Sequence, residues 1–312
     1  MRKTLPLLKK TPFVLDTRPL AEASSAHAGL LATSRAFRSL GIPDLVEEVV
    51  RLRKRSRGFT EGQLIESAVL LQTVGGDSPE DIRLLGNDPC LERGLGYAPP
   101  KATALRDFLE MFHDEELELM RPPRAEQKSF IFPSAPALAA LQELQAHTVR
   151  RIARRYQQHG QAQQIATIDQ DATLIESHKR SALPHYEGGR GYQPMVAVWA
   201  EADLVVADEF RDGNVPARQE PLTCARMAFA ALPEDIRERY FRGDSACHER
   251  ELLAWLTHPD RTDEKGGAIG FAISASMSDG LREALQDIPE REWKTFGTDR
   301  DGTLRQWADV PF

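Results

Sequence analysis

Three aspartates combine the residue type and the spacing that metal-dependent chemistry needs. Asp169 and Asp171 are separated by one residue in an alternating polar and apolar segment, and Asp244 follows a later segment that ends in Arg242-Gly243. Alternate residues of a strand point to the same face, so the first two carboxylates lie roughly 7 Å apart along the chain. A buried carboxylate without a basic partner is costly, and hard cations bind carboxylate oxygens. One interpretation of the pattern is therefore that these acids share a cation such as Mg²⁺.

The same three residues fit a second interpretation in which no metal is bound. Asp169 and Asp171 would be solvated on a one-sided sheet, and Asp244 would be the N-cap of the helical segment that follows it. The spacing alone does not favour either interpretation, so both are carried forward as hypotheses.

The elements that must position these acids belong to the second half of the chain. After Gly160 the apolar residues change from a helical period to alternation. We expect strands at residues 164–174, 195–200, 204–210, 237–242 and 268–274, and helices at 221–232, 249–256 and 279–285. The first strand carries Asp169 and Asp171, and its opposite face is mostly apolar, so we expect it to be central. Three strands, a helix and then strand, helix, strand is the order of an RNase H-like domain.

The first half of the chain has the pattern of short helices joined by tight turns. Helix starts are marked by Pro43, by a Thr60–Gln63 capping box, by Ser78-Pro79, by Asp88-Pro89 and by Thr103 as an N-cap. This arrangement suits a helix-turn-helix-like module, whose second helix can enter the major groove of DNA. Many small helical domains bind no DNA, so the pattern alone does not assign that role.

A connector rich in proline and charge, residues 121–134, leads into a predicted long helix over residues 136–158. Its expected buried stripe is Leu138, Leu141, Leu144, Thr148, Ile152 and Tyr156. Four arginines fall beside this stripe: Arg150, Arg151, Arg154 and Arg155. A local basic face can hold DNA phosphates while acids elsewhere set the total charge, and a solvated helix surface is the alternative. We predict DNA contacts for these four arginines.

The composition is that of a globular protein without a membrane span. Of 312 residues, 41% are hydrophobic and 28% are charged, and no apolar run approaches the ~20 residues that a spanning helix needs. The N-terminal segment lacks the apolar stretch and the cleavage site of a signal peptide. Cys90, Cys224 and Cys247 lie far apart, which favours a reducing compartment, so we expect a cytoplasmic location. The net charge of −7 argues against a binder of nucleic acid that is basic throughout.

The chain contains an ordered series of short motifs. These blocks are His27–Leu30, Gly75–Asp77 with Asp81-Ile82, Gly96–Pro100 with Leu105–Leu109, Ile168–Thr173, Gly189–Pro194, Arg211–Asn214 and Phe241–Ser245. They resemble successive parts of the DDE-domain group 1 transposases of bacterial insertion sequences. Each block is short, but their order and separations together are specific. The family's D-x-T/S pattern falls on Asp171-Ala172-Thr173, with Asp169 as the alternative, and Asp244 matches the second acid. Ser245–Cys247 departs from the small and then aromatic residues expected after it.

The resemblance implies an α+β fold with two parts. An all-helical DNA-binding region, residues 1–160, precedes an RNase H-like domain with a mixed five-stranded sheet, residues 161–312. The implied reaction is cleavage and joining of DNA with Mg²⁺ or Mn²⁺. Asp171 and Asp244 would be catalytic, and Asp171, Asp244 and Asp169 are the candidate metal ligands. The implied partners are the terminal inverted repeats of the element, held by a homodimer.

The third acid of such a site is not assigned. In this family it lies on a later helix, after a β-rich insertion, in a pattern of Tyr or Arg, then Glu, then Lys. Residues 293–310 look like the start of that insertion, and the nearby Glu290 and Glu292 sit in no such pattern. We therefore expect a C-terminally incomplete chain, truncated within the insertion. Two other functions stay open: a truncated protein that binds the element's ends without cutting, and an RNase H-like nuclease that cuts without joining.

Three further motifs are given structural interpretations. Gly188–Gly191 lacks the Lys-Ser/Thr of a phosphate loop and is expected to be a flexible connector over the site. Asp299–Gly302 lacks the remaining ligands of a calcium loop and is expected to be a hairpin turn. Cys247 and His248, as neighbours on a helix, would point about 100° apart, so we do not expect them to act as a nucleophile pair.

Overall fold

A computed structural model describes residues 24–53, 58–126, 128–258 and 267–310 of the chain, which forms two compact units. Unit 1 comprises the described residues up to Asp114 together with Ala135–Leu144, and unit 2 comprises Glu115–Ser134 and the described residues from Gln145. The division falls inside the long helix α8 (Pro136–Gln158), whereas the sequence pattern predicted an end of the helical region at residue 160. None of the described helices is long and apolar enough to span a membrane.

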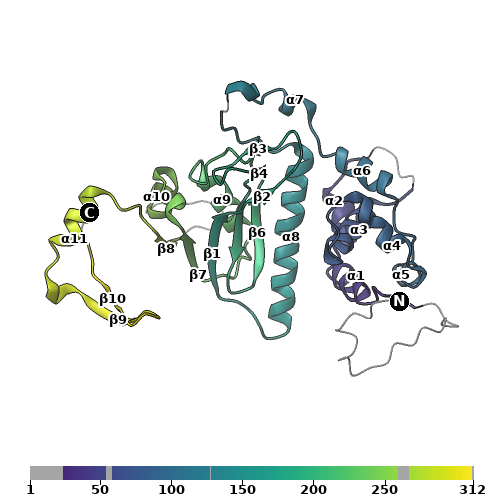
Figure 1. Ribbon diagram of the computed structural model, residues 1–312. Helices are drawn as coiled ribbons and strands as arrows, with labels where there is room; N and C mark the ends of the chain where they lie inside the picture. The colour runs from purple at the N-terminus through teal and green to yellow at the C-terminus, as the bar shows by residue number, and fades with distance from the viewer. Residues whose placement is uncertain (1–23, 54–57, 127, 259–266, 311–312) are drawn as a thin grey trace, which may run out of the picture. The chain divides into compact units, whose positions relative to one another are not determined.

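Unit 1 is built from short helices (Figure 1). They are α1 (Leu30–Ser39), α2 (Ile42–Val49), α3 (Glu61–Thr73), the 3₁₀ helix η2 (Pro79–Ile82), α4 (Arg83–Gly86), α5 (Pro89–Leu95) and α6 (Ala102–Glu110). The predicted capping box at Thr60 and Gln63 is confirmed, and Asp88 caps α5. The predicted N-cap at Thr103 is wrong. Lys101 already has extended backbone, and α6 starts directly after it, so Thr103 lies inside the first turn.

A buried polar network ties α1 to α3 in unit 1. The Glu66 carboxylate on α3 accepts hydrogen bonds from the Arg38 guanidinium at 2.9 Å, from the Ser34 hydroxyl at 2.7 Å and from the Tyr97 hydroxyl at 3.1 Å. A buried carboxylate is tolerated when donors surround it in this way. These contacts fix the relative positions of α1, α3 and the turn after α5.

A connector that contains α7 (Glu115–Glu118) and the 3₁₀ helix η3 (Arg124–Glu126) precedes α8, whose bounds match the prediction. The predicted apolar stripe is only partly right, because Leu138 is exposed and Val149 is buried instead. The two halves of α8 pack on different cores. Leu144 belongs to a core of unit 1, whereas Val149 belongs to the core of unit 2, so no single straight stripe is buried along all of α8.

The main sheet of unit 2 has five strands. They are β1 (Ile165–Ala172), β5 (Met195–Trp199), β6 (Leu204–Glu209), β7 (Glu238–Gly243) and β8 (Gly270–Ile273), in the order β6-β5-β1-β7-β8. β5 is antiparallel to β1 and to β6, whereas β7 is parallel to β1 and to β8. The predicted α+β fold with a mixed five-stranded sheet is confirmed. Three antiparallel strands in sequence, followed by two strands parallel to the first, is an RNase H-like order.

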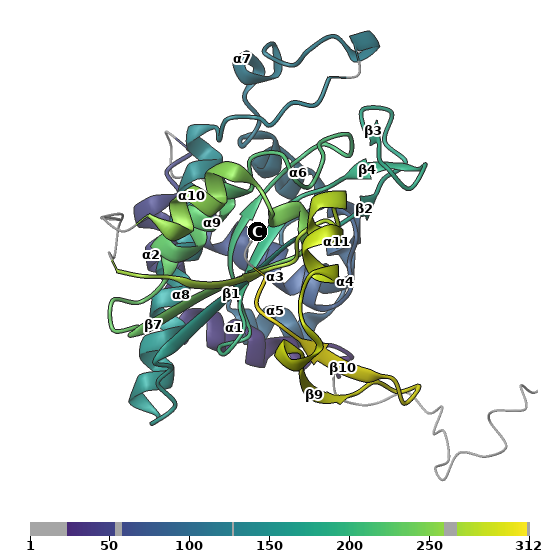
Figure 2. The same ribbon diagram turned by 90° about the vertical axis from the view of Figure 1, so that its left-hand side faces the viewer.

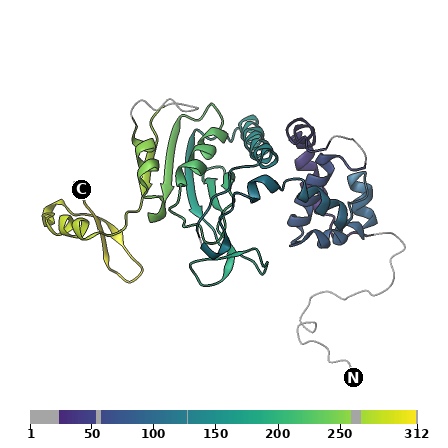
Figure 3. The same ribbon diagram turned by 90° about the horizontal axis from the view of Figure 1, so that it is seen from above.

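Helices cover one face of this sheet. The second half of α8, α9 (Pro221–Ala231) and α10 (Arg250–Thr257) share one core with Ala166, Ile168 and Phe241 of β1 and β7. α8 and α9 lie on the same side of the sheet (Figure 3). The opposite face of β1 carries Thr167, Asp169 and Asp171, none of which is buried. The central strand therefore presents its acids on the face that these helices leave uncovered.

A small second sheet corrects one prediction. β2 (Ile175–Glu176), β4 (Arg190–Tyr192) and β3 (Leu183–Pro184) pair in that order, apart from the main sheet (Figure 2). The prediction of a flexible connector at Gly188–Gly191 is therefore wrong in part, because Arg190 and Gly191 belong to β4, the middle strand of this small sheet. A Cβ on Gly191 would lie 2.2 Å from the backbone oxygen of Ile175, so this glycine permits close strand approach rather than flexibility.

The last described elements follow β8. They are α11 (Asp279–Gln286), the 3₁₀ helix η5 (Glu290–Glu292) and a hairpin of β9 (Lys294–Thr298) and β10 (Leu304–Trp307). The predicted turn at Asp299–Gly302 is confirmed. The Asp299 N–H donates to Thr303 O at 2.9 Å, and Gly302 has φ +82°, the left-handed conformation that glycine adopts readily.

Candidate active site

Asp171 lies near the carboxyl end of the central strand β1. Alternation along β1 buries Ala166, Ile168 and Gln170 and leaves Asp171 exposed on the other face. One carboxylate oxygen, Oδ1, accepts a hydrogen bond from the backbone N–H of Ala172 at 2.8 Å. The side chain is thus fixed at a strand end and remains accessible to a ligand.

Asp244 is brought beside Asp171 by the parallel pairing of β7 with β1. The register aligns Asp169 with Arg242 and Gln170 with Gly243, and one further residue along both strands would bring Asp171 opposite Asp244. Neighbouring strands lie about 4.8 Å apart, so the two aspartates start from adjacent backbones. Asp244 also caps the 3₁₀ helix η4 (Ser245–Cys247), because its Oδ1 accepts from Ala246 N–H at 2.9 Å.

The glycine before Asp244 is required by close packing. A Cβ on Gly243 would lie 2.6 Å from Cβ and 2.7 Å from Sγ of Cys247, which is buried. The Cys247 thiol also lies 3.8 Å from the backbone oxygen of Gln170 on β1. The turn that carries Asp244 is therefore packed directly against β1, and this contact sets the position of the second acid.

Both aspartates line one open cleft of about 740 Å³. Its other walls come from the β3–β4 turn, from the loop after β6 and from the turn after β7. The polar residues that line it besides the two acids are Tyr186, Gln193, Asn214, Arg218, Ser245, His248 and Ser276. The structure thus joins Asp171 and Asp244, which are 73 positions apart in the sequence, in a single site that is open to solvent.

Asp169, the third predicted metal ligand, has a different environment. Its two carboxylate oxygens accept hydrogen bonds from Nε and Nη2 of Arg242, both at 2.5 Å, and it is not among the residues that line the cleft. The hydrogen bond to Asp169 raises the pKa of the Arg242 guanidinium. A role for Asp169 as a metal ligand stays a prediction, and it requires this ion pair to open.

The donor set of the cleft fits a divalent cation. Mg²⁺ is usually held by one or two carboxylates, with water and substrate phosphate oxygens completing its octahedron. Asp171 and Asp244 supply two carboxylates from adjacent strands at an open cleft, which suits such a cation. Within the described ranges, no group of three or more His, Cys, Asp or Glu side chains gathers as a metal cluster, and a third acid is not assigned.

Arg211 supports the rim of the cleft. From the sequence, this residue was named only as part of the block Arg211–Asn214 and was given no role. Arg211 is buried, and its guanidinium donates to the Glu209 carboxylate, to Gln219 O at 2.7 Å and to Glu220 O at 3.1 Å. Burial raises the pKa of the Glu209 carboxyl, and the Arg211 guanidinium opposes that rise. Arg211 thereby closes the loop between β6 and α9, which forms one wall of the cleft.

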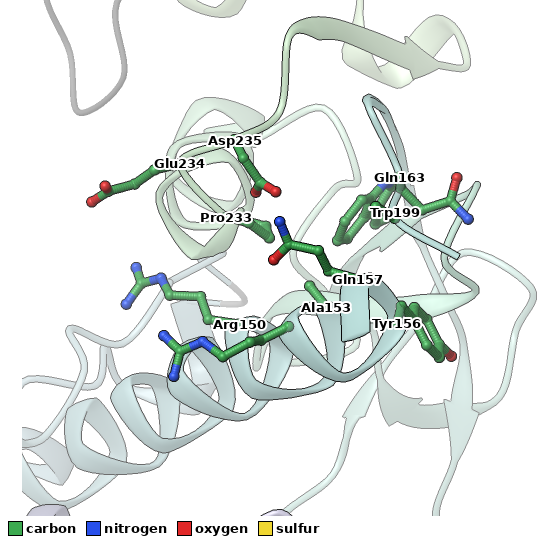
Figure 4. A pocket seen from close by; sticks show the side chains of 11 residues that line it. Arg150, Ala153, Tyr156, Gln157, Gln163, Trp199, Pro233, Glu234 and Asp235 are labelled. Carbon is green, nitrogen blue, oxygen red and sulfur yellow. The ribbon is translucent and has the colours of Figure 1, made fainter. Parts of the chain in front are cut away.

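The four predicted DNA-binding arginines lie away from the acids. Arg150 and Arg154 line a separate pocket of about 390 Å³ with Glu234 and Asp235, at the end of α8 (Figure 4). The Arg150 guanidinium donates to Ala230 O at 2.6 Å, whereas Arg154 and Arg155 are exposed. The helix packs on the buried face of β1, and the acids occupy the opposite face. Within one chain, these arginines and Asp171 therefore lie on opposite sides of the sheet.

Burial makes Cys247 a structural residue, and this predicts slow modification of its thiol. Desolvation raises the pKa of Cys247 to about 12, and burial also raises the pKa of Cys224. A thiol reagent at pH 8 should modify the partly exposed Cys90 first and Cys247 only after unfolding. Mass spectrometry of peptides after timed labelling measures this order. Modification of Cys247 in the folded protein at the rate of Cys90 would contradict it.

Comparison with known proteins decides the family. The model of the family "Transposase DDE domain group 1" matches residues 21–303. The chain belongs to this family. No curated protein matches the chain. Among solved structures, the chain is similar to one described as the crystal structure of the mariner Mos1 paired end complex with Mg, at 14% identity over 75% of this chain and 74% of that chain. The TM-score is 0.17, too low to carry an argument.

Membership in the Transposase DDE domain group 1 family confirms the predicted resemblance and supports a transposase function for the chain. The match covers all the strands of the main sheet, and both cleft aspartates fall within it. The roles of individual residues, including Asp171 and Asp244, stay predictions.

Proposed function

We propose that the chain cleaves and joins DNA at the ends of a mobile element, with Asp171 and Asp244 holding Mg²⁺ or Mn²⁺. The observation that carries the proposal is the common cleft of these two carboxylates at the ends of adjacent parallel strands. Membership in the transposase family supports the reaction class. The proposed substrate is the element's terminal inverted repeats, held by two copies of the chain.

The chemistry follows from what the cleft offers to a phosphodiester. When bound, a divalent cation stabilises the negative charge that develops on the phosphate during in-line attack. Asp171 would hold the cation from the end of β1, and Asp244 would hold it from the turn after β7, which packs against β1 through Cys247. The open cleft leaves room for the DNA strand, and Arg218 and His248 line it as groups that can contact phosphate oxygens.

The exposed arginines of α8 are proposed to bind DNA outside the cleft. Replacing both Arg154 and Arg155 with Ala should lower DNA affinity and reduce the slope of log K against log salt by about 1 for each phosphate that an arginine no longer neutralises. Arg282→Ala on α11 is a matched control, because Arg282 is also exposed. Titrations at several salt concentrations measure the slope. An unchanged slope in the double variant would show that α8 does not bind phosphates.

Cleavage and joining of a labelled duplex that carries the element's end, assayed with Mg²⁺, Mn²⁺ or a chelator, test the proposal. Metal-dependent nicking followed by joining to a second duplex is the expected result. Nicking without joining would identify a nuclease. Specific binding without nicking at any metal concentration would overturn the catalytic proposal.

One contact favours a second candidate function, a protein that binds the element's ends without cutting them. Asp244 is the N-cap of η4, as the metal-free interpretation of the sequence expects. That interpretation has Asp169 solvated, whereas Asp169 is paired with Arg242. This candidate predicts competition with an active transposase for the same ends.

A further inference from the structure

An exposed aromatic side chain stands at the wall of the cleft. Tyr186 is 76% exposed, and it lines the cleft that contains Asp171 and Asp244. Single exposed hydrophobic residues are common on protein surfaces, so exposure alone does not mark a function. The turn that carries this ring and the hollow beside it are what distinguish Tyr186.

The turn that presents Tyr186 is held in one conformation. It joins β3 to β4, and His185 at its base is buried. The backbone N–H of His185 donates a hydrogen bond to Gly189 O at 3.1 Å, and the backbone N–H of Gly188 donates to His185 O at 3.0 Å. The Glu187 N–H also donates to Nδ1 of the His185 ring at 3.3 Å.

Both glycines of the turn are needed for this conformation. Gly188 has φ +92°, and a Cβ on Gly189 would lie 2.6 Å from Nε2 of His185. The turn is thereby built around a buried imidazole, with Tyr186 directed to solvent. Because the backbone of the turn is already fixed, only the Tyr186 side chain loses conformational freedom when the ring contacts a ligand.

A second hollow adjoins the cleft. Its volume is about 400 Å³, it is lined by Lys128, Arg190 and Phe130 among others, and it shares Asn214 with the cleft. The β3–β4 hairpin contributes to both, with Arg190 facing the hollow and Tyr186 facing the cleft. The two carboxylates of the hollow, Glu118 and Asp212, are both paired with Arg121. Lys128 and Arg190 are exposed cations, and Lys128 lies 3.9 Å from the exposed Glu126 carboxylate. A chain of phosphates that leaves the acidic cleft past the hairpin would therefore meet positive charge.

We propose that Tyr186 is a stacking platform for one base of a single DNA strand whose reacting phosphate lies at Asp171 and Asp244, with the strand continuing toward Arg190 and Lys128. Grooves that bind single strands combine aromatic rings for the bases with cations for the backbone, and stacking tolerates any base because every base has a π-face. This inference rests on the proposed function, since it requires DNA in the cleft.

The ring face, rather than the phenol oxygen, carries the proposed role. The nearby Glu187 carboxylate raises the pKa of the Tyr186 hydroxyl, so the phenol keeps its proton, and stacking uses only the ring face, which phenylalanine retains. Tyr186→Phe should therefore behave like the unmodified chain, whereas Tyr186→Ala should not.

The test uses the full chain and a short single-stranded oligonucleotide in which 2-aminopurine replaces one base at a time, with Ca²⁺ present. The fluorescence of 2-aminopurine falls when the base stacks. Quenching at one position is expected for the unmodified chain and for Tyr186→Phe. Tyr186→Ala should lose that quenching and bind about 5- to 100-fold more weakly. Phe296→Ala is the matched control, because Phe296 is an exposed aromatic residue outside the cleft.

Several outcomes would overturn the inference. Unchanged quenching and affinity in Tyr186→Ala, or losses in Tyr186→Phe as large as those in Tyr186→Ala, would each exclude stacking on the ring face. Neither result bears on the proposed cleavage, which Asp171→Asn and Asp244→Asn test separately. Absence of binding of this oligonucleotide by the unmodified chain would overturn the stacking, whereas the proposed function fails only if the labelled duplex is not cut. Equal melting temperatures of the variants would show that loss of the ring, rather than unfolding, causes any difference in binding.

Discussion

Replacing Asp244 with Asn is expected to lower the rate of metal-dependent DNA cleavage by about 10³-fold, and Asp171→Asn should do the same. A bound cation stabilises the transition state by several kcal/mol, and each 1.36 kcal/mol corresponds to a tenfold change in rate. The fold should survive, because Asn is as good an N-cap as Asp and can still accept the hydrogen bond from Ala246. Single-turnover cleavage of a labelled duplex at saturating Mg²⁺ measures the rate.

Asp169→Asn is the matched control for these two variants. It makes the same chemical change two residues away from Asp171, but it affects an exposed ion pair, whose contribution is about 0–1 kcal/mol. We expect it to cleave within a few fold of the unmodified chain. Equal losses in all three variants would point to a general effect of charge, and a loss in Asp169→Asn alone would move the first acid from Asp171 to Asp169.

Arg211→Met is expected to destabilise unit 2 by about 3–5 kcal/mol. The substitution removes the partner of the nearly buried Glu209 and leaves the backbone oxygens of Gln219 and Glu220 without this donor. Breaking one side of a buried ion pair has this order of cost. For a unit of this size the melting temperature should fall by roughly 10 °C. Thermal unfolding followed by circular dichroism measures the change.

Arg218→Met makes the same change seven residues later in the same loop, where the side chain is exposed and lines the cleft. Its melting temperature should stay close to that of the unmodified chain, because exposed substitutions usually change stability by less than about 0.5 kcal/mol. Similar destabilisation by both variants would contradict the role given to Arg211 in closing the loop.

The central strand of the main sheet was predictable because the alternation of polar and apolar residues along β1 follows burial. The segment that became β1 alternates Ala166, Ile168 and Gln170 with the two acids, and this pattern predicted a central strand with a common acidic face. The small sheet was not predictable, since β2, β3 and β4 have only two or three residues each. Such strands are too short to show a period, and their glycines suggested flexibility.

Errors in the helices have a similar origin. A single apolar stripe was drawn along α8, but the helix contributes to two cores, so Leu138 is exposed and Val149 is buried. Thr103 was chosen as a cap by residue type, whereas the extended backbone of Lys101 decides where α6 begins. Local residue preferences do not report the tertiary packing that determines which residues of α8 are buried and where α6 begins.

The pairing of Asp171 with Asp244 was predicted from strand order and from the family resemblance, but the residues that support it were not. The bond from Arg242 to Asp169 depends on the register between β7 and β1, which spacing along the chain cannot give. Arg211 and Tyr186 also escaped notice as individual residues. Arg211 donates to backbone oxygens of Gln219 and Glu220 in its own loop, and Tyr186 stands on a turn built around the His185 ring. Residue types alone do not reveal either loop conformation.

Binding of Mn²⁺ to the chain in the presence of a short duplex tests most directly whether Asp171 and Asp244 hold a cation together. Electron paramagnetic resonance of free Mn²⁺ gives the affinity without requiring turnover. We predict that Asp171→Asn and Asp244→Asn each weaken binding at least about tenfold, the order seen when metal sites lose a supporting group, and that Asp169→Asn does not. Mn²⁺ affinity that is the same in the unmodified chain and in both cleft variants would contradict a shared cation at these two residues.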